Sequence, residues 1–389
     1  ARHDDLRSMA SSGIKPLSDT ARLDWLRLIR SENVGPVVFR QLLDRYGSPA
    51  AALEALPDLA ARAGAKRKIR LCPPSEAEAE AAAVRKAGAK LIALCEPDYP
   101  APLRALDDAP PVLTVLGDPA ALALPSVGMV GARNASANGR RFAERLAGDL
   151  AKAGFCVASG LARGIDTAAH RGALPRPTVA VVAGGVDIIY PPENDGLHAE
   201  IRKHGAVVSE VPLGTTPQAR HFPRRNRLIS GLSLGVVVVE AAKRSGSLIT
   251  ARCAGDQGRE VFAVPGSPLD PRAAGCNQLL RDGATLVESA GDILEVLAAR
   301  RPAAEAPEIA AAGRDLPPAA PPEAGTAERA RIEELLGADP ILVDDVVRLS
   351  GLPIAVVHGV LLELELAGRA ERHPGNRFAR LYKAPADPL

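Results

Sequence analysis

The stretch VGMVGARNASANGRRFAERLAGDLAKAGFCVASG, residues 127–160, decides the fold of this chain. It starts with a short apolar run at Val127–Val130, continues with helical spacing over Asn138–Ala153, and ends with a second apolar run at Phe155–Ser159. Short apolar runs joined by a helix are typical of parallel strands whose sheet is covered on both faces. The stretch therefore predicts one strand–helix–strand unit of a parallel sheet.

The same alternation extends over residues 121–298. Another amphipathic stretch occupies Leu248–Gln257, and five further apolar runs lie at Thr178–Ala183, Ala206–Val211, Gly235–Ala241, Glu260–Val264 and Thr285–Val287. Several runs end in glycine or serine, and an open α/β sheet binds ligands beyond the carboxyl ends of its strands. These features predict a Rossmann-like α/β core with a mostly parallel sheet, whose glycines lie where a phosphate-bearing ligand would bind.

A helical module is predicted before this core, over residues 20–120. Its helices at Leu23–Ile29 and Val37–Tyr46 are separated by the breaker Val34-Gly35-Pro36. This texture is typical of SAM-like or helix-hairpin-helix modules, which can bind the DNA backbone through the amides of the turn. A small bundle that serves only packing or dimerisation has the same texture, so both interpretations stay open.

A linker and a winged helix are predicted after the core. Residues 299–325 are rich in proline and alanine without a period, which is typical of an extended linker. Residues 326–383 predict three helices, at Ala327–Leu336, Leu342–Leu349 and Ile354–Ala367, followed by a hairpin. Winged helices often bind duplex DNA through the third helix. Here that helix carries two glutamates and no lysine or arginine, so a protein contact is at least as well supported.

Composition restricts the class of protein. The 389 residues are 47% hydrophobic but only 3% aromatic, and their net charge of +2 indicates no partner by itself. The five cysteines are scattered without C-x-x-C spacing, so a disulfide framework or zinc site is not indicated and a cytoplasmic protein is expected. Residues 1–13 are polar, without an apolar targeting segment, and the longest apolar stretch, near Gly235–Ala242, is too short for a membrane span.

The sequence lacks the motifs that mark common catalytic sites. It contains no G-x-x-x-x-G-K-[ST] loop, no G-x-G-x-x-G turn, no H-E-x-x-H and no G-x-S-x-G. We therefore predict no catalytic residue, no metal ligand and no cofactor, and interpret the chain as a binding protein.

Two glycine-containing turns follow predicted strands and resemble anion sites. Gly131 and Arg133 form the first, and Gly160 and Arg163 the second. Glycine lets backbone amides approach an anion, and arginine adds a charge-assisted hydrogen bond to a phosphate. Asp166 is predicted to cap the helix Thr167–Leu174, and His170 to be a structural histidine rather than a metal ligand.

The sharpest cluster is HFPRRNRLI at 221–229. Three arginines occur in four positions where the helix predicted at Leu228–Leu232 opens, and no acidic residue lies between Glu210 and Glu240. Such a one-sided field suits a polyanion. The candidate DNA-binding residues of the cluster are Phe222, Arg224, Arg225, Asn226 and Arg227. Because Phe222 is the only aromatic residue beside them, binding is expected to depend on phosphates more than on stacking.

A second polar turn follows the strand Gly235–Ala241. Its cations, hydroxyls and glycine amides are typical of a phosphate-binding nest, although ordinary helix capping by Ser247 is the alternative. The candidate residues are Lys243, Arg244, Ser245, Gly246, Ser247 and Thr250.

Eight motifs in a fixed order resemble the DNA-processing protein A (DprA/Smf) family: VGMVGARNAS (127–136), SGLARGIDTAAH (159–170), AGGVDIIYPPEN (183–194), SEVP (209–212), HFPRRNRLISGLS (221–233), VVVEAAKRSGSLITA (237–251), GREVFAVPG (258–266) and GCNQLLRDGA (275–284). The resemblance implies a cofactor-free homodimer that binds and protects single-stranded DNA and delivers it to the RecA recombinase during natural transformation. It also implies a DNA pocket formed by Arg133, Arg224–Arg227 and the 244–250 turn.

Two other functions use the same features. A nucleotide phosphoribohydrolase of the lysine-decarboxylase-like group would use the glycine-rich strand ends and Asp166, but its P-G-G-x-G-T-x-x-E motif is absent. An interaction adaptor would use the winged helix as its partner surface.

Overall fold

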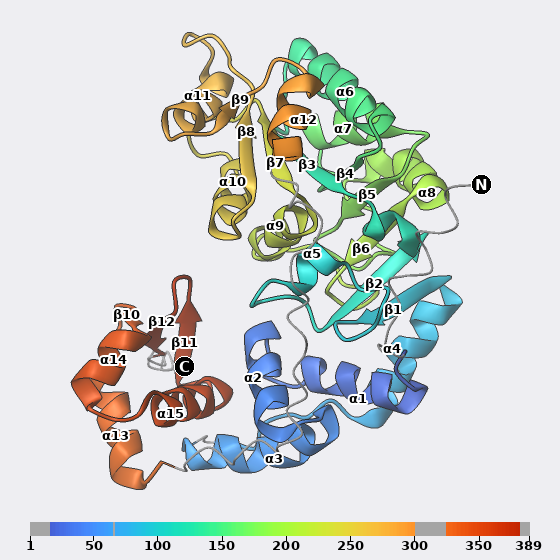
Figure 1. Cartoon of the computed structure of the whole chain (residues 1–389). Helices are drawn as coiled ribbons and strands as arrows, with labels where there is room; N and C mark the ends of the chain where they lie inside the picture. The colour runs from blue at the N-terminus through green and yellow to red at the C-terminus, as the bar shows by residue number, and fades with distance from the viewer. Residues whose placement is uncertain (1–15, 65–66, 300–323, 382–389) are drawn as a thin grey trace, which may run out of the picture. The chain divides into compact units, whose positions relative to one another are not determined.

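The computed structural model describes residues 16–64, 67–299 and 324–381, so most of the predicted linker lies outside the described residues (Figure 1). The chain divides into two compact units. One holds the sheet, from Ala79 onward to the end of the core. The other combines the segment Ser18–Glu78 with the C-terminal domain. Each unit is described by itself.

The core is built on one sheet with the strand order β1-β2-β6-β5-β4-β3-β7-β8-β9. The strands are β1 (Ala89–Ala93), β2 (Val112–Gly117), β3 (Ser126–Gly131), β4 (Cys156–Ser159), β5 (Thr178–Val181), β6 (Ala206–Ser209), β7 (Gly235–Val239), β8 (Glu260–Ala263) and β9 (Thr285–Leu286). Strands β3 to β9 pair in parallel, and β2 is antiparallel to both of its neighbours. The predicted Rossmann-like, mostly parallel sheet is confirmed.

The sheet has a topological switch point between β3 and β7. The chain adds β4, β5 and β6 on one side of β3, and then returns to place β7 on the other side, with Met129 paired to Val237. At such a point the two crossover connections diverge, which leaves a crevice at the carboxyl ends of the strands. The turns after β3, β4 and β7 therefore lie along one edge.

Alternating side chains of the strands fill two apolar layers. On β3, Val127 and Met129 pack with α6 (Ala137–Lys152), α7 (Ile165–Ala173) and α12 (Ala290–Ala299). Val130 faces the opposite layer. That layer contains α5 (Ala101–Arg104), α9 (His221–Leu232), α10 (Ser247–Asp256) and α11 (Ala274–Arg281), while α4 (Pro74–Lys86) and α8 (Asp195–His204) cover the β5–β6 side. Short 3-10 turns occupy Pro119–Ala123, Pro192–Asn194 and Pro271–Ala273.

The core begins earlier than residue 121, where the sequence places its start. Strands β1 and β2 lie at 89–117 and extend the sheet by pairing with each other and with β6. The expectation that this segment belongs to the helical module is wrong for residues 89–117. Its strands are short and follow a helical region, and their pairing with β6 joins residues about ninety positions apart in the sequence, which no local pattern reveals.

The second unit contains the helical module and the winged helix. The module comprises α1 (Asp19–Arg30), α2 (Pro36–Tyr46) and α3 (Pro49–Arg62), with the rings of Trp25 and Phe39 5.0 Å apart in its core. The winged helix comprises α13 (Thr326–Leu335), β10 (Ile341–Leu342), α14 (Val343–Ser350), α15 (Ile354–Leu366), β11 (Ala370–His373) and β12 (Arg377–Arg380). Its strands follow the order β10-β12-β11, as a wing requires.

Candidate nucleic-acid interface

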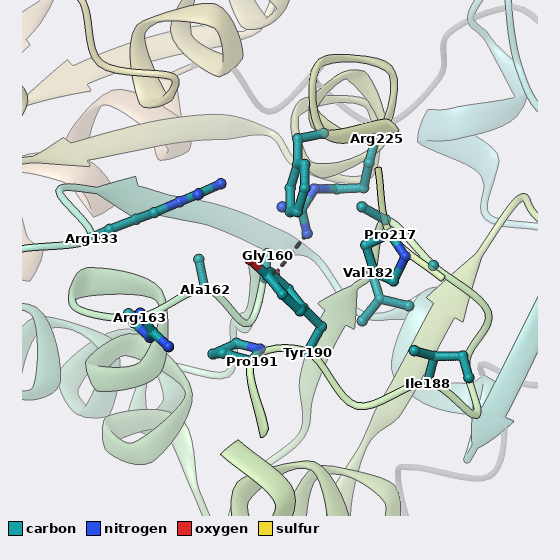
Figure 2. Close-up of a pocket in the computed structure, with 13 residues that line it drawn as sticks. Arg133, Gly160, Ala162, Arg163, Val182, Ile188, Tyr190, Pro191, Pro217 and Arg225 are labelled. Carbon is teal, nitrogen blue, oxygen red and sulfur yellow. Dashed lines mark hydrogen bonds between the residues drawn. The ribbon is translucent and has the colours of Figure 1, made fainter. Parts of the chain in front are cut away.

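A small pocket opens beyond the carboxyl ends of β4 and β5, beside the switch point (Figure 2). Its cavity measures about 50 Å³, so it admits one small group of a ligand. Figure 2 shows Arg133 and Arg225 reaching toward the same space from opposite sides, with Tyr190 and Arg163 nearby. The lining comprises Arg133, Gly160, Ala162, Arg163, Val182–Gly184, Ile188, Tyr190, Pro191, Pro217, Phe222 and Arg225.

Phe222 is the centre of a cation–aromatic cluster at this pocket. The Arg133 guanidinium carbon lies 5.0 Å from the Phe222 ring centroid, and that of Arg225 lies 6.0 Å from it. The Tyr190 ring lies 5.8 Å from Phe222 in a tilted arrangement. Cations within about 6 Å of a ring face are held by its quadrupole. The cluster therefore combines positive charge with flat apolar surface.

Arg225 is the buried member of the cluster. Its guanidinium donates hydrogen bonds to Gly160 O, at 2.7 Å, and to Val181 O, so it bridges the ends of β4 and β5. Burial lowers the pKa of Arg225 to about 10, which leaves it charged at neutral pH. The nearby Asp166 carboxylate opposes this shift. Arg225 is thus a fixed positive charge in the pocket wall.

Asp166 closes the turn after β4, and the prediction that it caps the following helix is wrong. The N-cap of α7 is Gly164, at φ +77°, and a Cβ there would lie 2.2 Å from Ala132 O. Only glycine fits that backbone and that space. The helix therefore begins earlier than predicted, and Asp166 is buried within its first turn. Its carboxylate accepts hydrogen bonds from Gly160 N at 3.1 Å and Ala162 N at 3.4 Å.

In the sequence, the turns after β3 and β4 resemble anion sites, but in the structure carboxylates of the chain itself bind the amides there. Asp166 holds the amides after β4, and Glu240 accepts from Ser136 N at 2.8 Å where α6 begins. Gly131 is packed against Val239 O, which would lie 1.9 Å from an added Cβ, so it serves the close approach of β3 and β7. The amides of Gly160, Ala162 and Ser136 are therefore not available to a ligand anion.

The arginines of the 221–229 cluster have three different environments, because α9 begins at His221 and places them on different helix faces. Arg224 is exposed, and Arg225 lines the pocket. Arg227 pairs with Glu210 and donates to Asp108 O at 2.7 Å. Its charge is therefore satisfied within the protein, which does not suit its predicted contact with DNA.

Asn226 links the cluster to the turn after β7. It is buried, and its Nδ2 donates to Gly246 O at 3.3 Å. In that turn Lys243 and Arg244 are exposed, whereas Ser247 and Thr250 are buried. The hydroxyls of Ser245 and Ser247 lie 2.7 Å apart, and the N-cap of α10 is Gly246. The accessible groups of the turn are thus its two cations and the residues 245–246.

His170 is a structural histidine, as its sequence context indicates. Its Nδ1 lies 2.8 Å from Thr178 Oγ1, and that hydroxyl donates to Val157 O. Burial lowers the pKa of His170 to about 3, so the ring is neutral. Within residues 16–64, 67–299 and 324–381, no group of three or more His, Cys, Asp or Glu side chains could hold a metal ion.

The comparisons with known proteins decide the family. The family model of DNA recombination-mediator protein A matches residues 90–298, and the models of a DprA-like N-terminal HHH domain and a DprA winged helix domain match residues 19–83 and 316–376. The chain belongs to the DNA recombination-mediator protein A (DprA/Smf) family. The DprA family model thus covers the whole sheet except its first residue, together with all the pocket residues.

Similar proteins of the DprA family support the assignment along most of the chain. The Mycobacterium tuberculosis putative DNA processing protein DprA is 38% identical over 82% of this chain and 82% of its own length, and Escherichia coli Smf is 43% identical over 74% and 76%. The Streptococcus pneumoniae DprA structure superposes with a TM-score of 0.60 at 34% identity, covering 72% of this chain and 98% of that one. The Helicobacter pylori structure, described as revealing a single-stranded-DNA binding mode, gives 0.50 at 30%, covering 54% and 96%.

Sequence reasoning missed Tyr190 and Pro217 in this DprA pocket. Tyr190 is 47% exposed and belongs to the quoted motif AGGVDIIYPPEN, but no pattern in that motif assigns the ring a role. Tyr190 lies thirty-two residues before Phe222 in the sequence, but the centroids of the two rings are only 5.8 Å apart. The expectation that Phe222 is the only aromatic residue beside the basic cluster is therefore wrong.

In the described part of the chain, no single helix is long and apolar enough to cross a membrane. The helices α14 and α15 pass such a test only when taken together, as a pair bent by 118°.

Asp166 gives this DprA-family core a specific pH dependence. Burial raises the pKa of Asp166 from 3.8 to about 6, against the opposing effect of Arg225. Between pH 4 and 6 the folded chain therefore keeps a proton that the unfolded chain loses, so raising the pH through this range lowers the free energy of unfolding. The slope is up to roughly 1.4 kcal/mol per pH unit.

Denaturant unfolding of the wild type and of Asp166→Asn at pH 4, 5, 6 and 7 measures this effect. The stability of the wild type relative to the variant should decrease from pH 4 to 6 and then stay constant. His170 titrates in both proteins and cancels in the difference. Parallel pH profiles would contradict the assignment.

Proposed function

We propose that this chain binds single-stranded DNA at the pocket of its core, protects it, and delivers it to the RecA recombinase during natural transformation. The single observation that carries the proposal is the cluster of Arg133, Arg225, Phe222 and Tyr190 in one pocket. Cations track a phosphate backbone, and aromatic rings stack on unpaired bases.

The aromatic rings of the pocket favour a single strand over a duplex. Phe222 and Tyr190 offer ring faces that paired and stacked bases cannot reach. Arg133, Arg224 and Arg244 are exposed, and Arg133 and Arg244 follow the carboxyl ends of β3 and β7, which supports their contact with successive phosphates. The H. pylori relative, described as binding single-stranded DNA, supports this choice.

Binding without catalysis is the better supported form of this function. The Asp166 carboxylate, which a phosphoribohydrolase would need for chemistry, is engaged by Gly160 N and Ala162 N behind the pocket wall. Family membership supports the remaining parts of the proposal, namely RecA as a partner, a homodimer and a cytoplasmic location. Release of free base from a nucleoside monophosphate by the pure protein would revive the enzymatic alternative.

A salt titration tests the proposed function directly. The full chain is mixed with a labelled oligothymidylate or with a duplex of equal length, between 50 and 300 mM salt. We expect tighter binding to the single strand, with a logarithm of affinity that falls linearly with the logarithm of salt concentration. Equal affinity for both forms, or an affinity that does not change with salt, would contradict the proposal.

Tyr190→Ala tests whether bases stack in the pocket. Loss of one base–aromatic contact costs about 1–3 kcal/mol, so the affinity for oligothymidylate should fall roughly 5- to 150-fold while the salt slope stays the same. Tyr190→Phe keeps the ring and should bind as the wild type does. An alanine variant that binds as tightly as the phenylalanine variant would exclude Tyr190 from the interface.

A further inference from the structure

Helix α15 of the winged helix is apolar on two faces. Val357, Val360 and Leu364 fill the core of the domain together with residues of the other two helices and the wing. Leu362 and Leu366 lie outside that cluster, one helical turn apart, yet they are only 3% and 1% exposed. A helix that is apolar all round is covered on both sides. A second surface therefore packs against α15.

The N-terminal helical module provides this second surface. Helix α3 lies against α15, and Ala63, the C-cap of α3, is 4% exposed and belongs to the same apolar cluster as Ile332 and Val360. Residues 18–78 also group with the C-terminal domain into one compact unit.

Each module donates a hydrogen bond to a carbonyl at the end of a helix in the other module. Asn33 Nδ2, from the turn before α2, donates to the carbonyl of Leu366, the last residue of α15, at 2.9 Å. In return Arg369 donates to Ala63 O at the end of α3, at 2.8 Å. The last carbonyls of a helix have no partner within the helix, so their satisfaction by the other module stabilises both helix ends.

Charged side chains complete the contact. Arg372 pairs with Glu365 at 3.3 Å and also donates to Gln41 of α2 at 3.4 Å. Arg369, which reaches Ala63, pairs at the same time with Glu333 of α13. The contact between the modules thus combines apolar packing with hydrogen bonds, and ion pairs within the winged helix hold two of the arginine donors in place.

We propose that the partner surface of the winged helix is the N-terminal helical module of the same chain, and that α15 is a protein-docking helix. The helix that reads duplex DNA in many winged helices is here covered by α3, and its sequence offers a DNA groove no lysine or arginine. The two modules form one body, although the whole core separates them in the sequence. This inference is independent of the DNA-binding pocket.

A cleavable linker tests the docking in the full-length protein. A protease recognition sequence is placed within residues 300–323, the chain is cut, and the fragments are separated by size-exclusion chromatography. The C-terminal fragment is expected to co-elute with the rest of the chain at equal stoichiometry. If the cut wild-type protein releases this fragment at micromolar concentration, the proposal is overturned.

Ala63→Glu is the informative variant. It places a charge against Ile332 and Val360 of the winged-helix core, at the contact between the two modules, and should weaken the association by roughly tenfold or more. Ala61→Glu makes the same change on the exposed face of α3 and should leave the fragments together. Equal co-elution of both variants would overturn the proposal.

Hydrogen exchange of the uncut chains separates undocking from misfolding. In Ala63→Glu, protection should fall in Asn33–Gly35 and at the end of α15 but persist in the helices of both modules. If α1–α3 lose protection as well, Ala63→Glu has misfolded, and Asn33→Ala tests the docking instead. That variant removes one hydrogen bond between the modules and should speed dissociation of the cut fragments severalfold. An unchanged dissociation rate would overturn the proposal.

Oligothymidylate binding should be equal in all variants, so a failure of the docking proposal is distinguishable from a failure of the DNA pocket.

Discussion

Replacement of Arg225 by alanine is expected to lower the free energy of unfolding by roughly 3–5 kcal/mol, because it removes a buried cation that offsets the charge of the nearby buried Asp166. The change would leave the Asp166 carboxylate buried without its compensating cation. It would also remove the hydrogen bonds to Gly160 O and Val181 O that join the ends of β4 and β5. Urea unfolding at pH 7 measures the loss.

Arg224→Ala is the matched control for this prediction. It makes the same substitution one residue earlier, on the exposed side of α9, and should change the stability by less than about 0.5 kcal/mol. The double variant Arg225→Ala/Asp166→Asn should recover part of the loss, because the unpaired buried charge is then gone. Equal stabilities of the two single alanine variants would contradict the buried role of Arg225.

Among the arginine substitutions, Arg133→Glu should cause the largest loss of DNA affinity while changing the free energy of unfolding little. Arg133 is exposed, lies over the Phe222 ring at 5.0 Å and faces the pocket. Reversal of its charge should weaken oligothymidylate binding roughly 10- to 100-fold at 0.1 M salt and reduce the salt slope by about one unit. Arg224→Glu should act in the same direction. Fluorescence anisotropy across a salt series measures both quantities.

Lys152→Glu controls for net charge. It makes the same type of reversal at the last residue of α6. A crossover helix returns from the carboxyl edge of the sheet to the opposite edge, so this charge is far from the proposed interface. Its effect on affinity should be less than about twofold at 0.1 M salt, where charges beyond roughly 10 Å are screened. If Lys152→Glu weakened binding as much as Arg133→Glu, a general electrostatic effect would replace the pocket.

The local patterns predicted most of the secondary structure of the core. The apolar run Val127–Val130 and the helical spacing of Asn138–Ala153 correspond to β3 and α6 within one residue at each end. Parallel strands that are buried on both faces require continuous apolar residues, and such a run can be recognised directly in the sequence. The antiparallel strands at 89–117 were not predicted, because their pairing with β6 depends on residues distant in sequence.

The candidate site was predicted in its charges but not in its geometry. The arginine run around Arg225 indicated a polyanion site, and the structure places Arg225 in the pocket. The same run contains Arg227, whose pairing with Glu210 and Asp108 turns it inward. One helical position rotates a side chain by about 100°, so neighbours in a charge run reach different surroundings.

The sequence by itself determined the alternation of strands and helices from β3 onward, the edge of the sheet where the glycine turns gather, and the sign of the charge there. Only the tertiary structure decided that Asp166 fills the turn after β4, that Tyr190 joins Phe222, and that α15 is covered by the N-terminal module. The physical reason is the range of the interactions. Periodicity and turn chemistry act between residues a few positions apart, whereas the availability of a side chain for a ligand depends on which distant groups have already satisfied it.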